Sequence, residues 1–390
     1  MRFPEFHGEW CVSTIGEQFD LYSGNTPSRL NKEHFEGNVN WITSGELKEH
    51  YISDTKEKIS EDAATANNLK LLHPGTFVIA IYGLEADGVR GTGSTTCKES
   101  TISQACMAFT QKGDVKNEFL YSWYKKHGNI IGIKYAQGTK QQNLSYDILE
   151  KFHIAYPSQD EQDKLIKFIS LLDERIASQS KLIEDLKKLK SAIIVEHYRQ
   201  TEKNEVCVAD LGNHFNVGNL AKDDLSETGK PCIIYGELFT TYGEIISQIE
   251  SHTNKTEGMI LSKKGDLLFP SSTTVDAVSL IAPSVINVDN VILGGDMFGI
   301  HINHNYNTQY LSYYFNHIAK KQLAKFAKGS TIIHLHYTDI EKAKLLLPSL
   351  EEQNRMAKCL VALDKKVSVE QNLLSSLTCQ KSYLLQQMFI

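Results

Sequence analysis

The chain carries one sequence unit twice, and this internal repeat constrains its fold more than any other feature. The six residues PSQDEQ at 157–162 return as PSLEEQ at 348–353, an offset of 191 residues. At this offset, residues 136–199 align with 327–390 without a gap, with 17 identities in 64 positions. A repeat of this length indicates two similar folding units, each with its own core. The 390 residues are therefore expected to form a duplicated structure rather than one large domain.

Each unit combines a mixed α/β part with one long helix. Short β-like runs at 76–81, 267–269 and 285–293 alternate with turns rich in Gly, Asn and Ser. Aromatic segments at 117–127 and 308–324 are predicted to be helical. The repeat and the helix signals predict four segments: a globular domain at 1–156, a long helix at 157–200, a second globular domain at 201–347 and a second long helix at 348–390.

Both long helices show the heptad pattern of a coiled coil. Each starts with Pro, Ser and acidic residues, and neither contains a further Pro or Gly. Their apolar residues alternate in steps of four and three. The predicted seam residues are Leu165, Ile169, Leu172, Ile176, Ile183 and Leu186 in the first helix, and Met356, Leu360, Leu363, Val367, Leu374 and Leu377 in the second.

The polar interruptions of the two seams fall at equivalent places. Gln179 corresponds to Glu370, and Lys190 corresponds to Lys381. A single amphipathic helix usually packs on its own domain, and this alternative stays open. Two matched seams favour pairing of the helices with each other. Because a whole globular unit separates the helices, the second can return beside the first, so an antiparallel coiled coil with pseudo-twofold symmetry is predicted.

Composition excludes several classes of protein. Hydrophobic residues make up 41% and charged residues 23%, which is typical of a folded protein and not of a disordered one. The 41 Lys and Arg against 47 Asp and Glu give a net charge of −6. A free-standing, high-affinity nucleic-acid binder is usually basic, so the composition alone speaks against one.

The cysteines and the apolar runs indicate the compartment. Seven scattered cysteines form no CxxC pair, which argues against a zinc site and a disulfide framework. The apolar runs are too short to span a bilayer, and the first ten residues do not resemble a secretory signal. We therefore expect a cytoplasmic protein with no membrane segment.

The motifs of common catalytic sites are missing. No two prolines are adjacent, which excludes the Pro-Pro loop of amino methyltransferases, and Gly229-Lys230 precedes Pro231, so no phosphate-binding P-loop exists. Gly91-Thr92-Gly93 lacks the third glycine of a dinucleotide site. The histidines at 301, 304, 334 and 336 have no Cys or His partners at zinc spacing. The sequence predicts no catalytic residue, no metal site and no cofactor bound by this chain.

The polar signals are of the recognition type. Basic loops with a glycine precede both long helices, and turn-rich stretches elsewhere offer hydroxyl and guanidinium groups. An ordinary solvated helix end is the alternative for each loop. The DNA-binding candidates are Thr26, Ser28, Arg29, Arg90, Lys134, Gln137, Thr139, Lys140, Ser272, Thr273, Thr274, Lys320, Lys321, Lys325, Lys328, Ser330 and Thr331.

These residues resemble the specificity subunits of type I restriction-modification systems along the whole chain. The most specific parts are the doubled segments GTKQQNLSYDILEKFHIAYPSQDEQ and GSTIIHLHYTDIEKAKLLLPSLEEQ. Further parts are the Leu-Asp pairs at 172–173 and 363–364, the stretch SGNTPSR, and SGEL at 44–47. The sequence departs from the pattern at 217–220, where VGNL replaces TPSR in the second copy.

The resemblance implies both a fold and partners. The fold class is α+β, with two similar α/β target-recognition domains separated by two long helices that form an antiparallel coiled coil. Each domain is expected to read one half of a bipartite, asymmetric site in double-stranded DNA. The expected partners are two methyltransferase subunits and restriction/translocase subunits. S-adenosylmethionine, ATP and Mg are expected on these partners, which can also supply phosphate contacts that the acidic chain lacks.

Two other classes stay open at this point. One is a non-catalytic coiled-coil scaffold whose globules bind proteins rather than DNA. The other is an enzyme whose site has no familiar motif. The bases that are read and the length of the spacer between the half-sites cannot be deduced, because recognition loops follow no transferable code.

Overall fold

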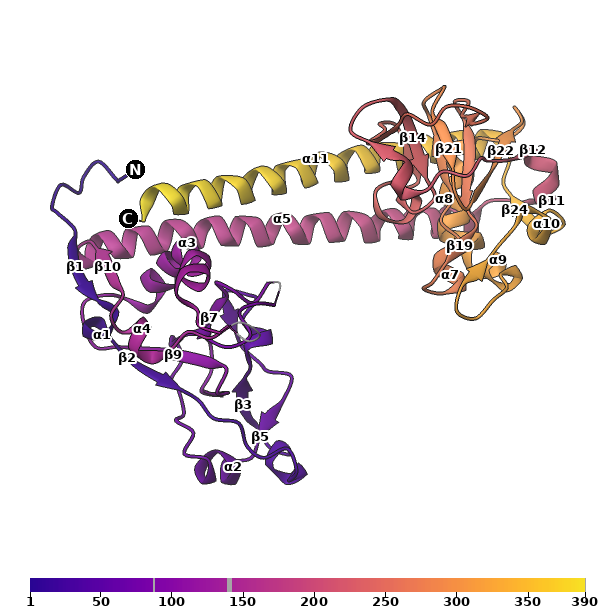
Figure 1. Cartoon of the computed structure of the whole chain (residues 1–390). Helices are drawn as coiled ribbons and strands as arrows, with labels where there is room; N and C mark the ends of the chain where they lie inside the picture. Colours follow the sequence, from indigo (N-terminus) through magenta and orange to yellow (C-terminus); the bar gives the residue numbers. More distant parts are fainter. Residues whose placement is uncertain (87, 139–141, 390) are drawn as a thin grey trace. The chain divides into compact units, whose positions relative to one another are not determined.

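The computed structural model describes residues 1–86, 88–138 and 142–389, and it divides into two compact units. The units are Met1–Ser180 with Asn372–Ile390, and Lys181–Gln371. Each unit contains one globule and one portion of each long helix, α5 (Gln159–Gln200) and α11 (Leu350–Met388), as Figure 1 shows. The division does not follow the four sequence segments, because each globule shares its hydrophobic core with both helices.

The first globule is built on a five-stranded and a three-stranded sheet. The five-stranded sheet has the order β2 (Phe19–Ser23), β9 (Cys106–Gln111), β6 (Phe77–Ala80), β7 (Gly93–Thr96) and β4 (Tyr51–Ile52). The smaller sheet has the order β5 (Lys58–Ile59), β3 (Val39–Ile42) and β8 (Ser100–Ile102), and β1 (Cys11–Thr14) pairs with β10 (His153–Tyr156). The helices are α1 (Ile15–Gln18), α2 (Glu61–Ala66), α3 (Asn117–Tyr135) and α4 (Tyr146–Leu149), with 3₁₀ turns η1 (Lys32–Phe35) and η2 (Ser44–Glu46).

The second globule contains two five-stranded sheets. One has the order β12 (Gly212–Asn216), β22 (Met297–Ile302), β18 (Asp266–Pro270), β20 (Ser284–Ile286) and β15 (Ile245–Ile246). The other has the order β13 (Leu225–Ser226), β16 (Ser251–Thr253), β14 (Lys230–Ile234), β21 (Ile292–Gly294) and β17 (Ile260–Leu261), and β11 (Asn204–Cys207) pairs with β24 (Lys344–Leu347). The helices are α6 (Glu237–Thr240), α7 (Ala277–Leu280), α8 (Thr308–Tyr314), α9 (Lys320–Leu323) and α10 (Tyr337–Ile340), with 3₁₀ turns η3 (Val208–Leu211), η4 (Lys222–Asp224) and η6 (Ala324–Phe326).

The sequence repeat is also a repeat of topology. Sheet order β2-β9-β6-β7-β4 in the first globule corresponds to β12-β22-β18-β20-β15 in the second. In both sheets the last pair is parallel and the other pairs are antiparallel. The strand pairs β3–β8 and β14–β21 are parallel as well. The duplicated α/β architecture predicted from the repeat is therefore confirmed.

Three predicted elements differ from the observed ones. The aromatic helix predicted at 117–127 continues to residue 135, because its two glycines do not end it. The helix predicted at 308–324 is interrupted by a π-helical turn, η5 (Phe315–Ala319). The β-run predicted at 285–293 is two strands, joined by a turn in which Asn290 takes the left-handed conformation that Asn tolerates (φ 62°).

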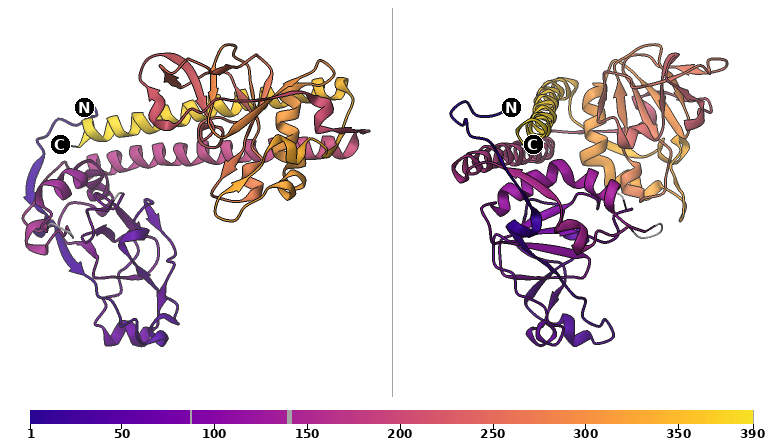
Figure 2. Two further views of the ribbon diagram at one scale, coloured as in Figure 1. Left: turned by 45° about the vertical axis from the view of Figure 1, so that its right-hand side comes forward. Right: turned by 60° about the vertical axis from the view of Figure 1, so that its left-hand side comes forward.

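The two long helices run antiparallel within each unit. In the first unit Leu165 and Ile169 of α5 share a core with Leu384 and Met388 at the far end of α11. In the second unit the other end of α5 packs with the start of α11, through Ile194 and Leu360 among others. Every residue of the predicted seam is buried or half-buried. Figure 2 shows the N-terminal segment returning beside the end of α11, where the terminal ammonium donates to the Gln387 carbonyl.

A buried glutamine explains why the doubled PSxxxQ motif starts each long helix. Gln162 and Gln353 are 0% and 1% exposed. Each donates to the carbonyl of the proline five residues earlier, at 3.0 and 2.9 Å. Each also accepts a backbone N–H of the residue just before α3 or α8, from Lys116 and Asn307 at 3.0 Å. The glutamine thus fastens the long helix to the aromatic helix of its globule.

Replacing Gln353 with leucine should destabilise the chain without changing its surface. The Asn307 N–H and the Pro348 carbonyl would lose their buried partner, which costs about 1–3 kcal/mol of unfolding free energy. Urea denaturation measures the loss, and Lys358→Gln, at an exposed position on the same helix, serves as control. Equal stability of the two variants would contradict the structural role assigned to Gln353.

Candidate nucleic-acid interface

The second globule holds a polar cleft that contains several of the predicted recognition residues. The short strand β19 (Ser272–Thr273) pairs antiparallel with β23 (Ile333–His334), which joins segments far apart in the sequence. The cleft beside this pair has a volume of about 780 Å³. Its lining includes Tyr235, Phe239, Ser272, Thr273, Thr274, Asp296, Lys320 and His334. Four predicted residues, Ser272, Thr273, Thr274 and Lys320, therefore lie at one site.

A hairpin tip borders this cleft and carries three further predicted residues. Lys328 and His334 exchange both backbone hydrogen bonds, at 2.9 and 2.7 Å. The tip between them exposes Ser330 and Thr331. Gly329 has φ +115°, and a Cβ there would lie 2.0 Å from the Ile332 carbonyl oxygen, so the tip needs glycine. A second cleft of about 500 Å³ lies at this hairpin and shares Asp296 and His334 with the first.

The charges at the two clefts are mixed. The Lys328 ammonium lies 2.5 Å from the Asp339 carboxylate and lowers the pKa of that carboxyl. The Ser272 hydroxyl donates to Asp296 at 2.7 Å. Hydroxyl, imidazole, ammonium and carboxylate groups side by side match the donors and acceptors on base edges better than they match a row of phosphates. This arrangement can bind a polar ligand through its hydroxyl, imidazole, ammonium and carboxylate groups.

Four lysines of the two predicted basic loops lie in helical turns of their own globules, which corrects the prediction of loops at these positions. Lys320 and Lys321 lie in α9, Lys325 lies in η6, and Lys134 lies in the last turn of α3. The two glycines of α3 do not end that helix, and residues 308–325 contain no Pro or Gly. Lys321 and Lys325 are exposed outside the lining of the 780 Å³ cleft.

In the first globule, Arg29 is occupied by partners of its own domain. Both terminal nitrogens donate to Glu57, at 2.8 Å each, and the guanidinium lies 5.0 Å from the Phe35 ring centroid. The hydrogen bonds from Arg29 lower the pKa of Glu57. Because the pair is exposed, it contributes little to stability. Thr26 is half-buried and Ser28 exposed in the same loop. The Glu57 pair uses two of the five guanidinium N–H donors of Arg29, so the remaining donors are available for a phosphate or a base.

Arg90 has a packing role that the sequence did not indicate. Its Nη2 donates to Gln142 at 2.8 Å, and its methylene groups lie against α3. A Cβ on Gly132 would lie 2.5 Å from Arg90 Cγ, so this glycine permits the close contact. Arg29 and Arg90 are thus held by different elements.

The other predicted residues of the first globule are dispersed. Lys134 lines an apolar groove of about 300 Å³ with Trp123 and Tyr135. Gln137 exchanges two backbone hydrogen bonds with Asn143, at 2.8 and 2.9 Å. Thr139 and Lys140 lie outside the described residues.

The segment that departs from the TPSR motif is structural in the second globule. Leu220 stands where the first copy has Arg29, and it is buried in a small core with Cys232 and Ile292. Gly218 forms a β-bridge with Gly294. The two globules therefore present different groups at this repeat position, as the departure in sequence suggested.

Within the described ranges, no three His, Cys, Asp or Glu side chains form a group that could hold a metal ion. In the same part of the chain, no helix is long and apolar enough to cross a membrane. All seven cysteines are free thiols.

Comparison with known proteins decides the family. The description "Type I restriction modification DNA specificity domain" matches residues 7–188 and again residues 201–378. The chain belongs to this family. The double match confirms the resemblance inferred from the doubled helix segments, and it places one specificity domain on each half of the repeat.

Several members of the type I specificity family are similar to this chain. The MjaVIII specificity subunit of Methanocaldococcus jannaschii is 22% identical over 402 residues, which cover 95% of this chain and 90% of that protein. The MjaIX specificity subunit of the same organism is 28% identical over 185 residues, which span 46% of this chain and only 42% of that protein.

Solved structures of specificity subunits share the fold. The S subunit from M. genitalium has a TM-score of 0.60 at 18% identity, and the similarity covers 100% of this chain and 99% of that one. A structure from a study of complex assembly and conformational transition of the type I R-M system has a TM-score of 0.62 at 14% identity, with 98% of both chains covered. The two-domain α+β architecture of this specificity family is therefore the fold of this chain.

Sequence analysis missed several residues of the clefts. Tyr235, Phe239, Asp296 and His334 line the 780 Å³ cleft, but they come from three separate segments. The pairings of β19 with β23 and of β14 with β21 bring these segments together. No local pattern signals such a site.

Proposed function

We propose that this chain is the DNA-recognition subunit of a type I restriction-modification complex. Each globule reads one half of a bipartite, asymmetric site in double-stranded DNA, and the paired helices set the spacing and dock two methyltransferase subunits. The observation that carries the proposal is the occurrence of the specificity domain twice, once on each globule of a duplicated fold. Two independent reading modules suit a site of two unlike halves.

The proposal includes a division of chemistry between subunits. This chain is a non-catalytic component. S-adenosylmethionine is bound by the methyltransferase subunits, and ATP and Mg by the restriction/translocase subunits. Adenine methylation requires a base flipped into a pocket that holds the methyl donor, whereas the described clefts are lined by polar groups suited to contacts with base edges. The acidic net charge fits this division, because partners can supply phosphate contacts.

In the second globule, the cleft between α6, β19 and β23 is the proposed reading site. It combines the hydroxyls of Thr273 and Thr274 with the ammonium group of Lys320 and the aromatic rings of Tyr235 and Phe239. Hydroxyl groups can contact any base edge, and aromatic rings can contact the methyl group of thymine. A lysine at the edge of the cleft suits a phosphate.

Methylation mapping tests the function directly. The chain is co-expressed with the methyltransferase subunit of its host, and adenine methylation is mapped with and without the chain. We expect one bipartite motif that appears only when both proteins are present, and no methyl transfer by the purified chain alone. A complex that forms but methylates without sequence preference would favour the protein-binding scaffold instead.

Two neighbouring lysines test the cleft. If Lys320 contacts a phosphate, Lys320→Gln should reduce the slope of log affinity against log salt by about 1 without altering the motif. Lys321→Gln, on the same helix but outside the cleft lining, is the matched control. Binding of the complex with its methyltransferase to motif DNA at several salt concentrations measures both slopes. If Lys320→Gln changed the slope no more than Lys321→Gln does, Lys320 would not be a phosphate contact.

A further inference from the structure

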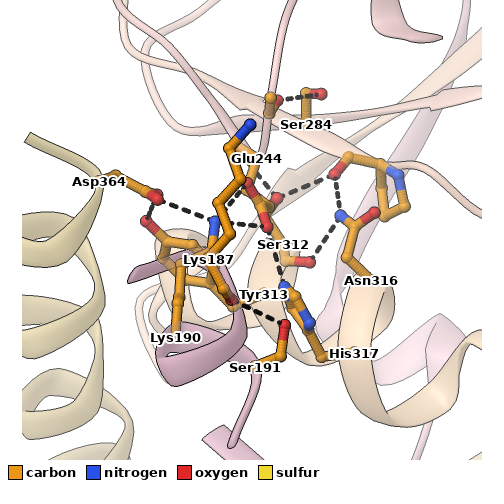
Figure 3. A network of polar contacts seen from close by, with 12 residues as sticks. Lys187, Lys190, Ser191, Glu244, Ser284, Ser312, Tyr313, Asn316, His317 and Asp364 are labelled. Atoms are coloured by element: carbon orange, nitrogen blue, oxygen red, sulfur yellow. Dashed lines mark hydrogen bonds and ion pairs between the residues drawn. The ribbon is translucent and has the colours of Figure 1, made fainter. Parts of the chain in front are cut away.

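A buried ionic network in the second unit joins both long helices to the second globule. Lys190 of α5 donates to both carboxylate oxygens of Glu244, at 2.9 and 3.1 Å, and to Asp364 of α11 at 2.8 Å. Glu244 precedes strand β15 of the globule. Figure 3 shows the ammonium group between the two carboxylates. One side chain of the coiled-coil seam therefore holds three segments that are distant in the sequence.

The network continues into the globule through the π-helical turn. His317 of η5 lies with its Nε2 2.9 Å from Glu244 Oε1, and the Tyr313 hydroxyl donates to Asp364 (Figure 3). Ser312 donates to the Glu244 backbone carbonyl at 2.7 Å. A π-helical turn inserts an extra residue and re-aims side chains, and such turns are frequent at functional positions. Here the turn follows α8 directly and carries the imidazole to Glu244.

The network restricts the orientation of the globule on the helices and adds little to the stability of their contact. Lys190 is 9% exposed, and an ion pair this buried gains little net stability because its charges lose their hydration. Burial would raise the pKa of Glu244, but His317 and Lys190 outweigh it and lower the pKa to about 2. The carboxylate is therefore charged at neutral pH. Charge-assisted hydrogen bonds accept a narrow range of angles, whereas apolar contacts allow sliding.

Glu244 also lies between the coiled coil and the proposed reading site. It lines a cleft of about 550 Å³ together with Lys187, Lys190 and Asp364 of the helices. It equally lines the 780 Å³ cleft that holds Thr273 and Lys320. A change in the position of Glu244 relative to Lys190 therefore shifts part of the lining of the reading cleft relative to α5.

The first unit has a joint at the repeat-equivalent position, with different groups. Lys381 of α11 pairs with Asp173 of α5, and these residues correspond to Lys190 and Asp364. The first globule adds His50, whose Nδ1 lies 3.6 Å from Asp173 and whose Nε2 lies 2.8 Å from Glu118. There the globule places an imidazole beside the aspartate, whereas in the second unit it bonds to the lysine through the Glu244 carboxylate and to the aspartate through the Tyr313 hydroxyl.

We propose that Lys190 and Glu244 are positioning residues that set the orientation of the second globule on the coiled coil and thereby restrict the complex to one spacer length between the half-sites. This inference rests on the proposed function and extends it. The residues do not touch DNA in this role. They act through the angle at which the reading cleft is presented.

Spacer selectivity measures this role directly. The full chain, co-expressed with its methyltransferase subunit, is tested on a plasmid library that carries both half-sites with varied spacers. Glu244→Gln keeps the shape of the side chain and removes its charge. We expect about a tenfold rise in methylation of spacers one base pair longer or shorter, relative to the preferred spacer, with the bases of both half-sites unchanged. Lys190→Met should have the same effect.

The controls separate positioning from stability. Lys187→Met, one turn earlier on α5, is the matched variant. In Figure 3 Lys187 contributes only its backbone carbonyl, which accepts a hydrogen bond from Ser191. It should keep the wild-type spacer preference. If Lys190→Met fails to fold in a thermal unfolding experiment, Glu244→Gln carries the test, and Glu244→Asp should restore part of the selectivity.

The outcomes distinguish two failures. If the wild-type complex methylates one bipartite motif and folded Glu244→Gln shows the same spacer preference, the positioning role is wrong and the proposed function stands. If the wild-type complex methylates no bipartite motif, the proposed function fails, and this inference fails with it.

Discussion

Removing one heptad from each long helix is expected to shorten the preferred spacer between the two half-sites. Deleting 176–182 from α5 and 372–378 from α11 keeps the four-three alternation of the seam, because seven residues are one full repeat. Neither deletion removes Lys190, Asp364, Lys381 or Asp173. Seven residues at 1.5 Å each shorten a helix by about 10 Å.

The change in DNA follows from the rise per base pair. Ten ångströms correspond to up to about 3 bp at 3.4 Å per base pair, and to fewer if the helices lie oblique to the DNA axis. In the parent complex we expect the half-site centres about 10 bp apart, so that both globules meet the same face of the duplex. Methylation of a library with varied spacers gives the preferred length for the parent and the deletion variant.

A deletion of four residues is the matched control for the heptad deletion. Removing only four residues from each helix turns the apolar seam away from its partner, since the heptad phase is lost. That variant should lose helix pairing, unfold at a lower temperature and fail to assemble with the methyltransferase. An unchanged spacer in a folded heptad-deletion complex would show that the helices do not set the distance.

The helices and the duplication were predictable because their signals are local or exactly periodic. The seam residues of both helices recur at fixed steps along the sequence. Each buried glutamine lies in a motif that occurs twice. The sequence also marked Lys190 and Lys381 as polar breaks. It could not assign their partners, because Asp364 and Glu244 lie 174 and 54 residues from Lys190.

The candidate site was predictable only in part, for the same physical reason. The hydroxyls at 272–274 stood out because three polar residues follow a buried strand. The cleft itself depends on the pairing of β19 with β23 and on the π-helical turn after α8. Arg90 has the residue type of a guanine reader, yet the glycine at 132 allows its stem to pack on α3. Such contacts are set by tertiary structure, which no local pattern encodes.

Replacing the first globule should change one half of the methylated motif and leave the other half intact. The exchange covers residues 1–156 and uses the corresponding part of another specificity subunit. Each globule has its own core, its own sheets and its own polar joint to the helices, so the second should keep its geometry when the first is exchanged. The half-site read by the second globule is therefore expected to keep its bases completely.

The graft must preserve the contacts that hold the first globule to the helices. Arg2 forms two hydrogen bonds to the buried Glu161 of α5, and Lys126 donates to the Gln386 carbonyl of α11 at 3.0 Å. A donor with basic residues at these two positions is the appropriate choice, since an unpaired Glu161 would cost about 1–3 kcal/mol or more. The reciprocal exchange of 201–347 is the control and should alter only the other half-site.

Sequencing of methylated DNA from the two exchanges identifies which globule reads which half. Independent reading predicts that the double exchange gives the combination of the two new half-sites, with each half as specific as in its single exchange. A single exchange that altered both halves would show that the two globules read the DNA as one surface. An independent module cannot change bases that are contacted only by the other module. In that case the duplicated topology would reflect shared ancestry of the two folds and not a division of the recognition site.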